Sequence, residues 1–144
     1  MEESKQYLVN PDETINGYKF IEKYVQVSGT RYRLRDIIQF AKKDNIWLEF
    51  EREPDNKYDK NAIKLIGCSK GFLANRKYFL GYVPKEISAN IVNRGLVQHT
   101  LPRLRRIWVP NEEDDATIIF QVLIKEEFHE KYTSNYDSHK GNYY

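Results

Sequence analysis

The chain is poor in the residues on which several kinds of site depend. It holds one cysteine, Cys68, and three histidines among 144 residues. A single cysteine excludes an internal disulfide framework and suits a reducing cytoplasm. It also cannot begin a thiolate zinc site. Nucleophilic catalysis needs a nucleophile beside a base, and no such motif surrounds Cys68, while the histidines are scattered. The sequence therefore gives no support for an enzyme.

Long apolar runs and a glycine-rich phosphate loop are also lacking. Without an apolar run no helix could span a membrane, and the acidic start (residues 1–4) is no signal peptide. Without a phosphate loop, no ATP hydrolysis can be assigned. The acidic run at residues 112–115 could bind a divalent cation, but acid runs in turns are usually solvated loops. We expect a soluble cytoplasmic protein with no cofactor and no metal.

Aromatic residues are abundant: they make up 14% of the chain, and 11 of them are tyrosines. Tyrosine serves either in a core or as a stacking platform, so abundance alone does not choose between the two. The net charge of +2 is weak support for a nucleic-acid partner, which usually calls for a more basic chain. The argument for a nucleic-acid partner therefore depends on local clusters of cations.

The length fits one domain, and the hydrophobic pattern divides the chain into three parts. We expect a polar leader at 1–17, a folded domain at 18–126 and a polar, Tyr-rich, mobile tail at 127–144. Helical spacing predicts one short helix over 34–43 and another that starts at Pro84 and ends before Gly95. Strands are expected at 18–32 (bent or broken at Ser28-Gly29), 46–51, 62–67, 79–83, 97–109 and 116–124. This pattern predicts a mainly β fold with two short helices, arranged as a small barrel or a strongly curved sheet.

The connection between the strands at 46–51 and 62–67 is longer than a hairpin turn requires. It combines turn residues, such as Pro54, with acids, amides and the pair Tyr58-Asp59. Binding groups usually lie on loops that a rigid sheet carries. This loop is therefore the first candidate for a functional site.

The same loop resembles a known family. The string EREPDNKYDKNAI (51–63), followed by FLGYVPKEISANIV (79–92) and preceded by GTRY (29–32), is similar to the HIRAN domain. The three pieces occur in the order that the family has, and together they cover roughly residues 18–126. The resemblance implies a small OB-like or SH3-like β-barrel that binds nucleic acid.

The resemblance also implies a site for the 3′ end of single-stranded DNA. Arg31 and Lys85 would contact phosphates, Tyr32 and Tyr58 would stack on or flank the terminal bases, and Asp59 would accept a hydrogen bond from the 3′-hydroxyl. An ionised carboxylate only accepts hydrogen bonds, so it favours a hydroxyl and repels a 3′-phosphate. Trp108 is the candidate for a further aromatic contact, and a core role suits it equally well. The expected setting is DNA repair, replication forks or mobile elements in a bacterium, with a helicase or nuclease as a possible protein partner.

Several readings of the same residues stay open. Each Tyr, Arg or Lys taken alone is more often surface packing than a ligand contact. On a regular strand Arg31 and Tyr32 would face opposite sides, so a bulge or a strand end is needed there. Arg103, Arg105 and Arg106 could extend a nucleic-acid track or form a solvated strand face. Two alternative functions stay open. One is a protein-interaction module on the same barrel. The other is a PD-(D/E)xK nuclease built on Asp55 and Lys57, which lacks its second acid.

Overall fold

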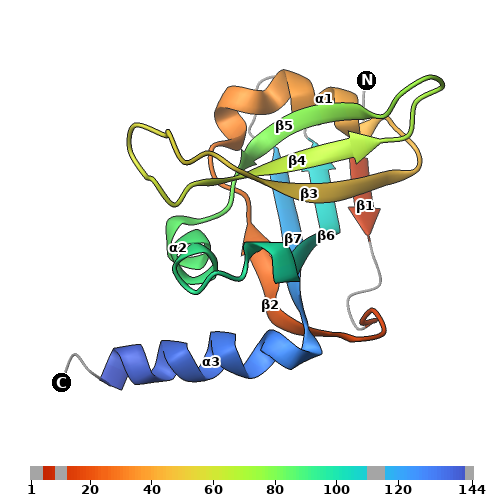
Figure 1. The fold of residues 1–144 in the computed structure, drawn as a ribbon. Coiled ribbons are helices and arrows are strands. Elements are labelled where there is room, and N and C mark those ends of the chain that lie inside the picture. The colour runs from red at the N-terminus through yellow and green to blue at the C-terminus, as the bar shows by residue number, and fades with distance from the viewer. Residues whose placement is uncertain (1–4, 9–12, 110–115, 142–144) are drawn as a thin grey trace.

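The computed structural model describes residues 5–8, 13–109 and 116–141, and the side chains of 13–109 and 116–133. Seven strands form two antiparallel sheets (Figure 1). Sheet A has the order β1-β6-β7-β2, and its strands are β1 (Lys5–Leu8), β6 (Thr100–Val109), β7 (Thr117–Lys125) and β2 (Tyr18–Gln26). Sheet B has the order β3-β4-β5, and its strands are β3 (Ile46–Arg52), β4 (Ile63–Ser69) and β5 (Arg76–Tyr82). The predicted mainly β fold is confirmed.

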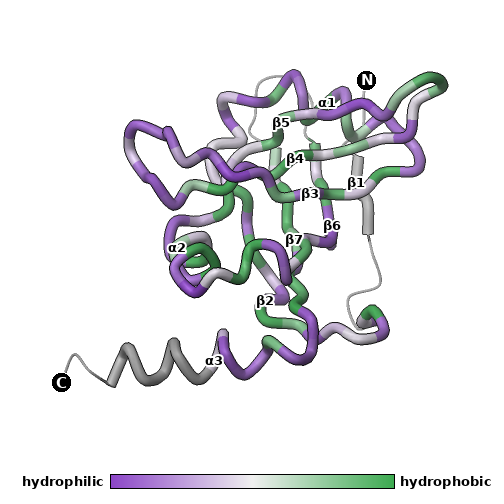
Figure 2. Tube along the Cα trace, viewed as in Figure 1, coloured by the Kyte–Doolittle hydropathy of each residue, from purple (hydrophilic) through white to green (hydrophobic). Residues whose placement is uncertain are grey.

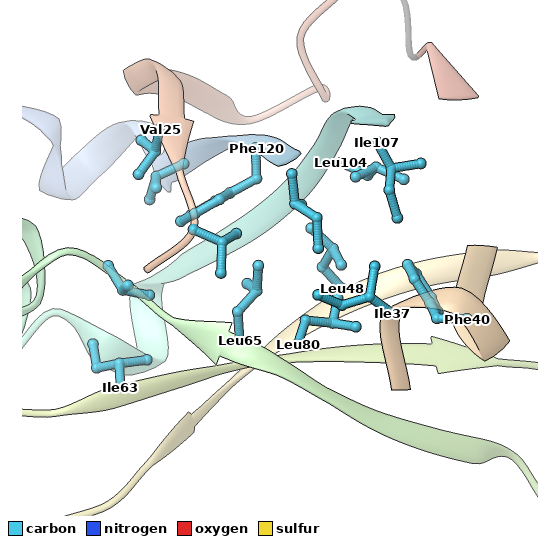
Figure 3. Close-up of a cluster of buried hydrophobic side chains, with 14 of the residues drawn as sticks. Val25, Ile37, Phe40, Leu48, Ile63, Leu65, Leu80, Leu104, Ile107 and Phe120 are labelled. Carbon is cyan, nitrogen blue, oxygen red and sulfur yellow. The ribbon is translucent and has the colours of Figure 1, made fainter. Parts of the chain in front are cut away.

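The core lies between the two sheets, which turn apolar side chains toward each other. Figure 3 shows side chains from sheet A meeting side chains from sheet B and from α1 (Leu34–Ala41). The apolar alternation of β7 drives this arrangement: Ile118, Phe120, Val122 and Ile124 are all fully buried. Helix α1 closes one end of the core with Ile37 and Phe40.

A pair of backbone hydrogen bonds links the two sheets at one corner. Just after β2, the N–H of Ser28 donates to the carbonyl of Tyr82 at 2.9 Å, and the N–H of Tyr82 donates back at 2.8 Å. Gly81 makes this approach possible, since a Cβ there would lie 2.4 Å from the Ser28 carbonyl oxygen. The two packed sheets are thus joined at this corner, and the strand pairing of the described residues does not close them into the small barrel that was expected.

Helix α2 (Lys85–Asn93) follows β5 directly and ends as the sequence predicts. Gly95 has a φ of 67°, its N–H donates to Val92, and the N–H of Leu96 donates to Ile91. These two bonds form a Schellman motif, which satisfies the last carbonyls of the helix. Leu96 is fully buried beside the helix end. The motif fixes the direction in which the chain leaves α2 toward the 3-10 turn η2 (Val97–His99).

The expectation of a mobile tail after residue 126 is wrong for its first part. Residues Glu126–Gly141 form a third helix, α3, which runs below sheet A and α2 (Figure 1). Tyr132 is only 5% exposed, and its hydroxyl donates to Glu22 at 3.2 Å. Phe128 stacks on His99 with ring centroids 3.8 Å apart. Two aromatic anchors four residues apart share one helix face, which outweighs the polar composition of the segment.

Two expectations remain, one for the polar leader and one for the acidic run at 112–115. Part of the leader forms β1, which pairs with β6 from Lys5↔Val109 to Leu8↔Arg106. The acidic run at 112–115 lies outside the described residues. No helix among the described residues is long and apolar enough to cross a membrane.

Candidate functional site

A pocket of about 330 Å³ opens where the sheet corner, the β3–β4 loop and the start of α2 meet. Figure 2 shows that the β3–β4 loop is hydrophilic. The residues that line the pocket come from three segments of the chain: Ser28, Asn56, Tyr58, Asp59, Ala62, Tyr82, Val83 and Lys85. The volume falls at the lower end of the range for small-ligand sites. Three predicted site residues therefore meet here, namely Tyr58, Asp59 and Lys85.

The β3–β4 loop is held in place by its own hydrogen bonds. The side-chain oxygen of Asn56 accepts from the backbone N–H of Tyr58 at 2.8 Å and of Asp59 at 3.0 Å. The Asn56 amide group donates to Glu53 at 2.6 Å. The two ends of the loop are joined by a bond from the Glu53 N–H to the Ala62 carbonyl. The pocket wall is therefore preorganised, which lowers the entropy cost of binding.

A carboxylate, a phenol and an ammonium group brace the loop against sheet B. The hydroxyl of Tyr82 donates to Glu53 at 2.7 Å, and the Lys64 ammonium lies 3.1 Å from the same carboxylate. Hydrogen bonds from Asn56 and Tyr82, with a contribution from Lys64, lower the pKa of Glu53 to about 2. Burial and the bond to Glu53 raise the pKa of Tyr82. Glu53 is thus a structural anion that orients the pocket wall.

Tyr58 and Asp59 differ in solvent exposure and in side-chain hydrogen bonding. The Tyr58 side chain is 89% exposed, so the loop holds its backbone while its ring faces solvent. Asp59 is half-buried, and its Oδ1 accepts from the N–H of Asn61 at 2.9 Å. A bond to a backbone N–H fixes the carboxylate rotamer. The pocket therefore combines an open aromatic face with an oriented acceptor.

Lys85 is exposed and is the first residue of α2. The N-terminal N–H groups of a helix have no partners within the helix, and the helix dipole favours an anion there. Pro84 provides no side-chain cap. An ammonium group beside such a helix end is suited to a phosphate.

Arg31 and Tyr32 lie in a short 3-10 helix, η1 (Thr30–Arg33), and the predicted strand start at these residues is wrong. Gly29, with a φ of 78°, turns the chain out of β2, and the N–H of Tyr32 donates to the Gly29 carbonyl. A left-handed glycine ends the strand, at the break predicted for Ser28-Gly29, and the 3-10 turn that follows was not predicted. Both side chains are exposed, Tyr32 by 77%, in a turn that begins two residues after the pocket residue Ser28. They do not line the pocket, and their turn η1 packs against β5, which ends in the pocket residue Tyr82.

Trp108 is not brought to the pocket. It is half-buried on β6 and alternates with Ile107 and Val109, which face the core, so its side chain lies on the outer face of sheet A. Five pocket residues were not singled out from the sequence: Ser28, Asn56, Ala62, Tyr82 and Val83. The spacing Asn-x-Tyr-Asp was a usable signal for Asn56, because an Asn side chain commonly accepts from the backbone two or three residues later.

The features of an enzyme site do not come together in the described part of the chain. No group of three or more His, Cys, Asp or Glu side chains in that part could hold a metal ion. Asp55 and Lys57, the fragments of the nuclease pattern, are exposed and do not line the pocket. Burial, helped by Glu49, raises the pKa of the Cys68 thiol to about 11. A thiol with that pKa is a poor nucleophile at neutral pH.

Two comparisons with known proteins give a match. The family model described as "HIRAN domain" matches residues 22–127 of this chain. The crystal structure of the HIRAN domain of human HLTF is similar, with a TM-score of 0.49 and 20% identity, over 85% of this chain and 93% of that chain. A search of curated proteins finds no match.

Proposed function

This chain belongs to the HIRAN family, whose domains are nucleic-acid-binding modules and not themselves catalytic, and we propose that its pocket binds the free 3′-hydroxyl end of single-stranded DNA. One observation carries the proposal: a cation, an exposed aromatic ring and an oriented carboxylate line a single pocket of about 330 Å³. A nucleotide at a strand end offers a phosphate, a base and a hydroxyl, one for each of these groups.

Phosphate contacts come from two sides of the pocket. Lys85 and the N-terminus of α2 receive the last phosphate, and Arg31 on η1 receives the one before it. In this arrangement the strand would cross the sheet corner at Ser28, which lines the pocket and precedes η1 by two residues. Cations spaced along a groove are typical of proteins that follow a single strand.

Tyr58 and Tyr32 supply the stacking surfaces. Both rings are mostly exposed, by 89% and 77%. An exposed ring gains apolar and stacking contacts when an unpaired base covers it, and a duplex cannot offer such a base. The two rings therefore favour single strands over duplexes.

Asp59 gives the site its preference for an end. Its carboxylate accepts the hydrogen of the 3′-hydroxyl, and an interior nucleotide has no hydrogen at that oxygen. Because Asp59 is half-buried and its rotamer is fixed by Asn61, its charge opposes a 3′-phosphate in the same place. The proposed setting is end recognition in DNA repair, at replication forks or in mobile elements of a bacterium, beside a helicase or nuclease.

A protein-interaction module is the second candidate, and one observation favours it. Phe72 and Leu73, at the tip of the β4–β5 hairpin, are 99% and 93% exposed. Exposed apolar side chains at a hairpin tip are a common docking feature for a partner protein. The tip is remote from the pocket residues, so docking there and DNA binding at the pocket are compatible.

Fluorescence anisotropy with matched oligonucleotides tests the proposal. A single strand with a 3′-hydroxyl is expected to bind more tightly than a blunt duplex of the same sequence. With two phosphate contacts, log affinity should fall by about 1.4 per tenfold rise in salt, at about 0.7 per contact. Equal binding of blunt duplex and single strand would remove the end-binding proposal.

A further inference from the structure

A second surface with nucleic-acid chemistry lies on the outer face of sheet A, away from the pocket. Strand pairing decides which residues face outward, because paired residues share a face. The pairs Leu104↔Phe120 and Ile107↔Ile118 are buried in the core. The pairs Arg106↔Ile119 and Trp108↔Thr117 alternate with them and lie on the outer face.

A bulge in β6 places two arginines side by side on that face. The register of β6 against β7 shifts between Leu104 and Arg106, which leaves Arg105 as the extra residue. A bulge lets consecutive side chains turn to the same side. Arg105 faces outward because its guanidinium lies 3.9 Å from the centre of the Tyr24 ring, and Tyr24 is 68% exposed. Arg106 is exposed beside it.

The outward residues of β2, β6 and β7 carry charge of one sign. Lys23, Arg103, Arg105 and Arg106 are among them, and no described outward residue of these strands is acidic. Glu22 is the one acid within these strands, and it turns inward to accept from the Tyr132 hydroxyl. Glu13, from the segment before β2, contacts Arg103, which donates to its carbonyl oxygen, and the negative charge of Glu13 acts on the Arg103 guanidinium.

Aromatic rings accompany these cations. Arg105 makes two contacts with Tyr24. Its guanidinium stacks on the ring, and its Nη2 donates to the hydroxyl at 2.6 Å. The ring is therefore held in one orientation while most of it stays exposed. Trp108 lies two residues beyond Arg106 on the same face. We name the set Lys23, Tyr24, Arg103, Arg105, Arg106 and Trp108 the arginine face.

We propose that the arginine face binds the interior of a single nucleic-acid strand, independently of the pocket. Proteins bind such a strand with cations, which contact its phosphates, and with flat surfaces, on which its unpaired bases stack. The arginine face offers both, as guanidinium groups and aromatic rings held together on a sheet. An anionic membrane surface or an acidic protein would use the charge but would not need the Tyr24–Arg105 stack. None of these residues lines the pocket, and the face points away from sheet B. The protein would then hold a strand at its end and along its length.

A closed circular single strand separates this proposal from end binding, because a circle has no 3′ end. The wild-type protein is expected to bind the circle. Tyr24→Ala and Arg106→Gln should each weaken that binding, Tyr24→Ala on the order of tenfold, as for a lost base stack. Asp59→Ala should weaken binding of a short linear 3′-hydroxyl strand and should not weaken binding of the circle, which offers no 3′-hydroxyl to that carboxylate. Phe72→Ala and Arg35→Gln, which remove an exposed ring and an exposed arginine elsewhere, are the matched controls.

Three results would overturn the proposal. The first is a wild-type protein that binds the linear strand but not the circle. The second is an equal loss of circle binding in the arginine-face variants and in their matched controls. The third is binding to phosphatidylserine vesicles that exceeds binding to the circle and falls with Arg106→Gln. Circular dichroism of each variant confirms that the fold is kept, and failure here leaves the pocket proposal intact.

Discussion

Asn56 is the residue that shapes the pocket wall most directly. Its side-chain oxygen accepts from two consecutive N–H groups, those of Tyr58 and Asp59, while its amide group donates to Glu53. A single side chain thus connects the proposed ligand contacts to the brace on sheet B. Hydrogen bonds of this kind each contribute roughly 0.5–1.5 kcal/mol, so their loss is measurable.

Asn56→Ala is expected to weaken binding of a 3′-hydroxyl strand by about 1–3 kcal/mol, from two lost hydrogen bonds that order the loop. The melting temperature should also fall by a few degrees, because the same hydrogen bonds stabilise the folded loop. Isothermal titration and thermal unfolding check the two halves of this prediction. Asn56→Asp keeps the acceptor and should fall between wild type and Asn56→Ala. Unchanged affinity in the alanine variant would mean that the loop is ordered by other contacts.

Glu53 predicts an acid dependence of stability. Its pKa is lowered to about 2 in the folded state from an ordinary value of 4.5. A lowered folded-state pKa adds stability that is complete above pH 4.5 and is lost as the pH falls toward 2. The difference in unfolding free energy between wild type and Glu53→Gln should therefore shrink over this window. Urea unfolding at a series of pH values measures it, and a constant difference would show that Glu53 is not braced as described.

The junction between β2 and β5 is the element on which the pocket depends. Ser28 and Tyr82 exchange two backbone hydrogen bonds there, and both residues line the pocket. Gly81 permits the contact, with a φ of 149° and no room for a Cβ. A substitution at Gly81 therefore tests whether the pocket requires the junction.

Gly81→Ala is expected to destabilise the protein by more than about 1 kcal/mol and to weaken strand binding. The added Cβ would lie 2.4 Å from the Ser28 carbonyl oxygen and 2.6 Å from a Val27 methyl group. Gly95→Ala is the matched control, because Gly95 also has a positive φ but nothing within 4 Å of its Cβ position. Thermal unfolding should show the larger loss at Gly81, and only Gly81→Ala should affect binding. Equal losses would mean that backbone strain, and not the junction, decides the effect.

The elements of this fold were predictable where one local signal dominates. The alternation in β7 and the glycine after α2 predicted both elements within a residue or two. The break at Ser28-Gly29 was predicted, but Arg31 and Tyr32 after it were assigned to a strand, because a short 3-10 turn leaves no periodic pattern of apolar residues. Helix α3 was missed since its stability comes from contacts of Phe128 and Tyr132 with distant parts of the chain. Sequence periodicity does not report contacts of that kind.

The same limit applies to the candidate site. The family resemblance indicated Tyr58, Asp59 and Lys85, and the structure brings these three together. Tyr82 was not anticipated, because its role as a brace for Glu53 depends on two strands meeting in space. Trp108 belongs to another surface, since strand alternation turns it away from the core.

The molecule as a whole is two sheets with α3 as an added support, and Tyr132 tests that description. Tyr132→Ala should destabilise the protein by about 3–5 kcal/mol, the usual cost of removing a buried ring. Tyr132→Phe keeps the ring and loses only the bond to Glu22, which should cost about 1 kcal/mol. Chemical unfolding of both variants measures the difference. A Tyr132→Ala protein as stable as wild type would show that the tail does not support the domain.

The central claim is that the pocket distinguishes a 3′-hydroxyl from a 3′-phosphate through Asp59. The most direct measurement is the affinity of wild type, Asp59→Ala and Asp55→Ala for matched single strands that differ only at the 3′ end. Asp55 is an exposed acid of the same loop that does not line the pocket, so it controls for the loss of charge. Asp59→Ala should weaken binding of the hydroxyl-ended strand by about 1.5–3 kcal/mol, as for a hydrogen bond to a charged group. Its effect on the phosphate-ended strand should be small or favourable, because a repulsion is also removed. An Asp59→Ala protein that stays folded and prefers the hydroxyl end by the wild-type margin would contradict the account.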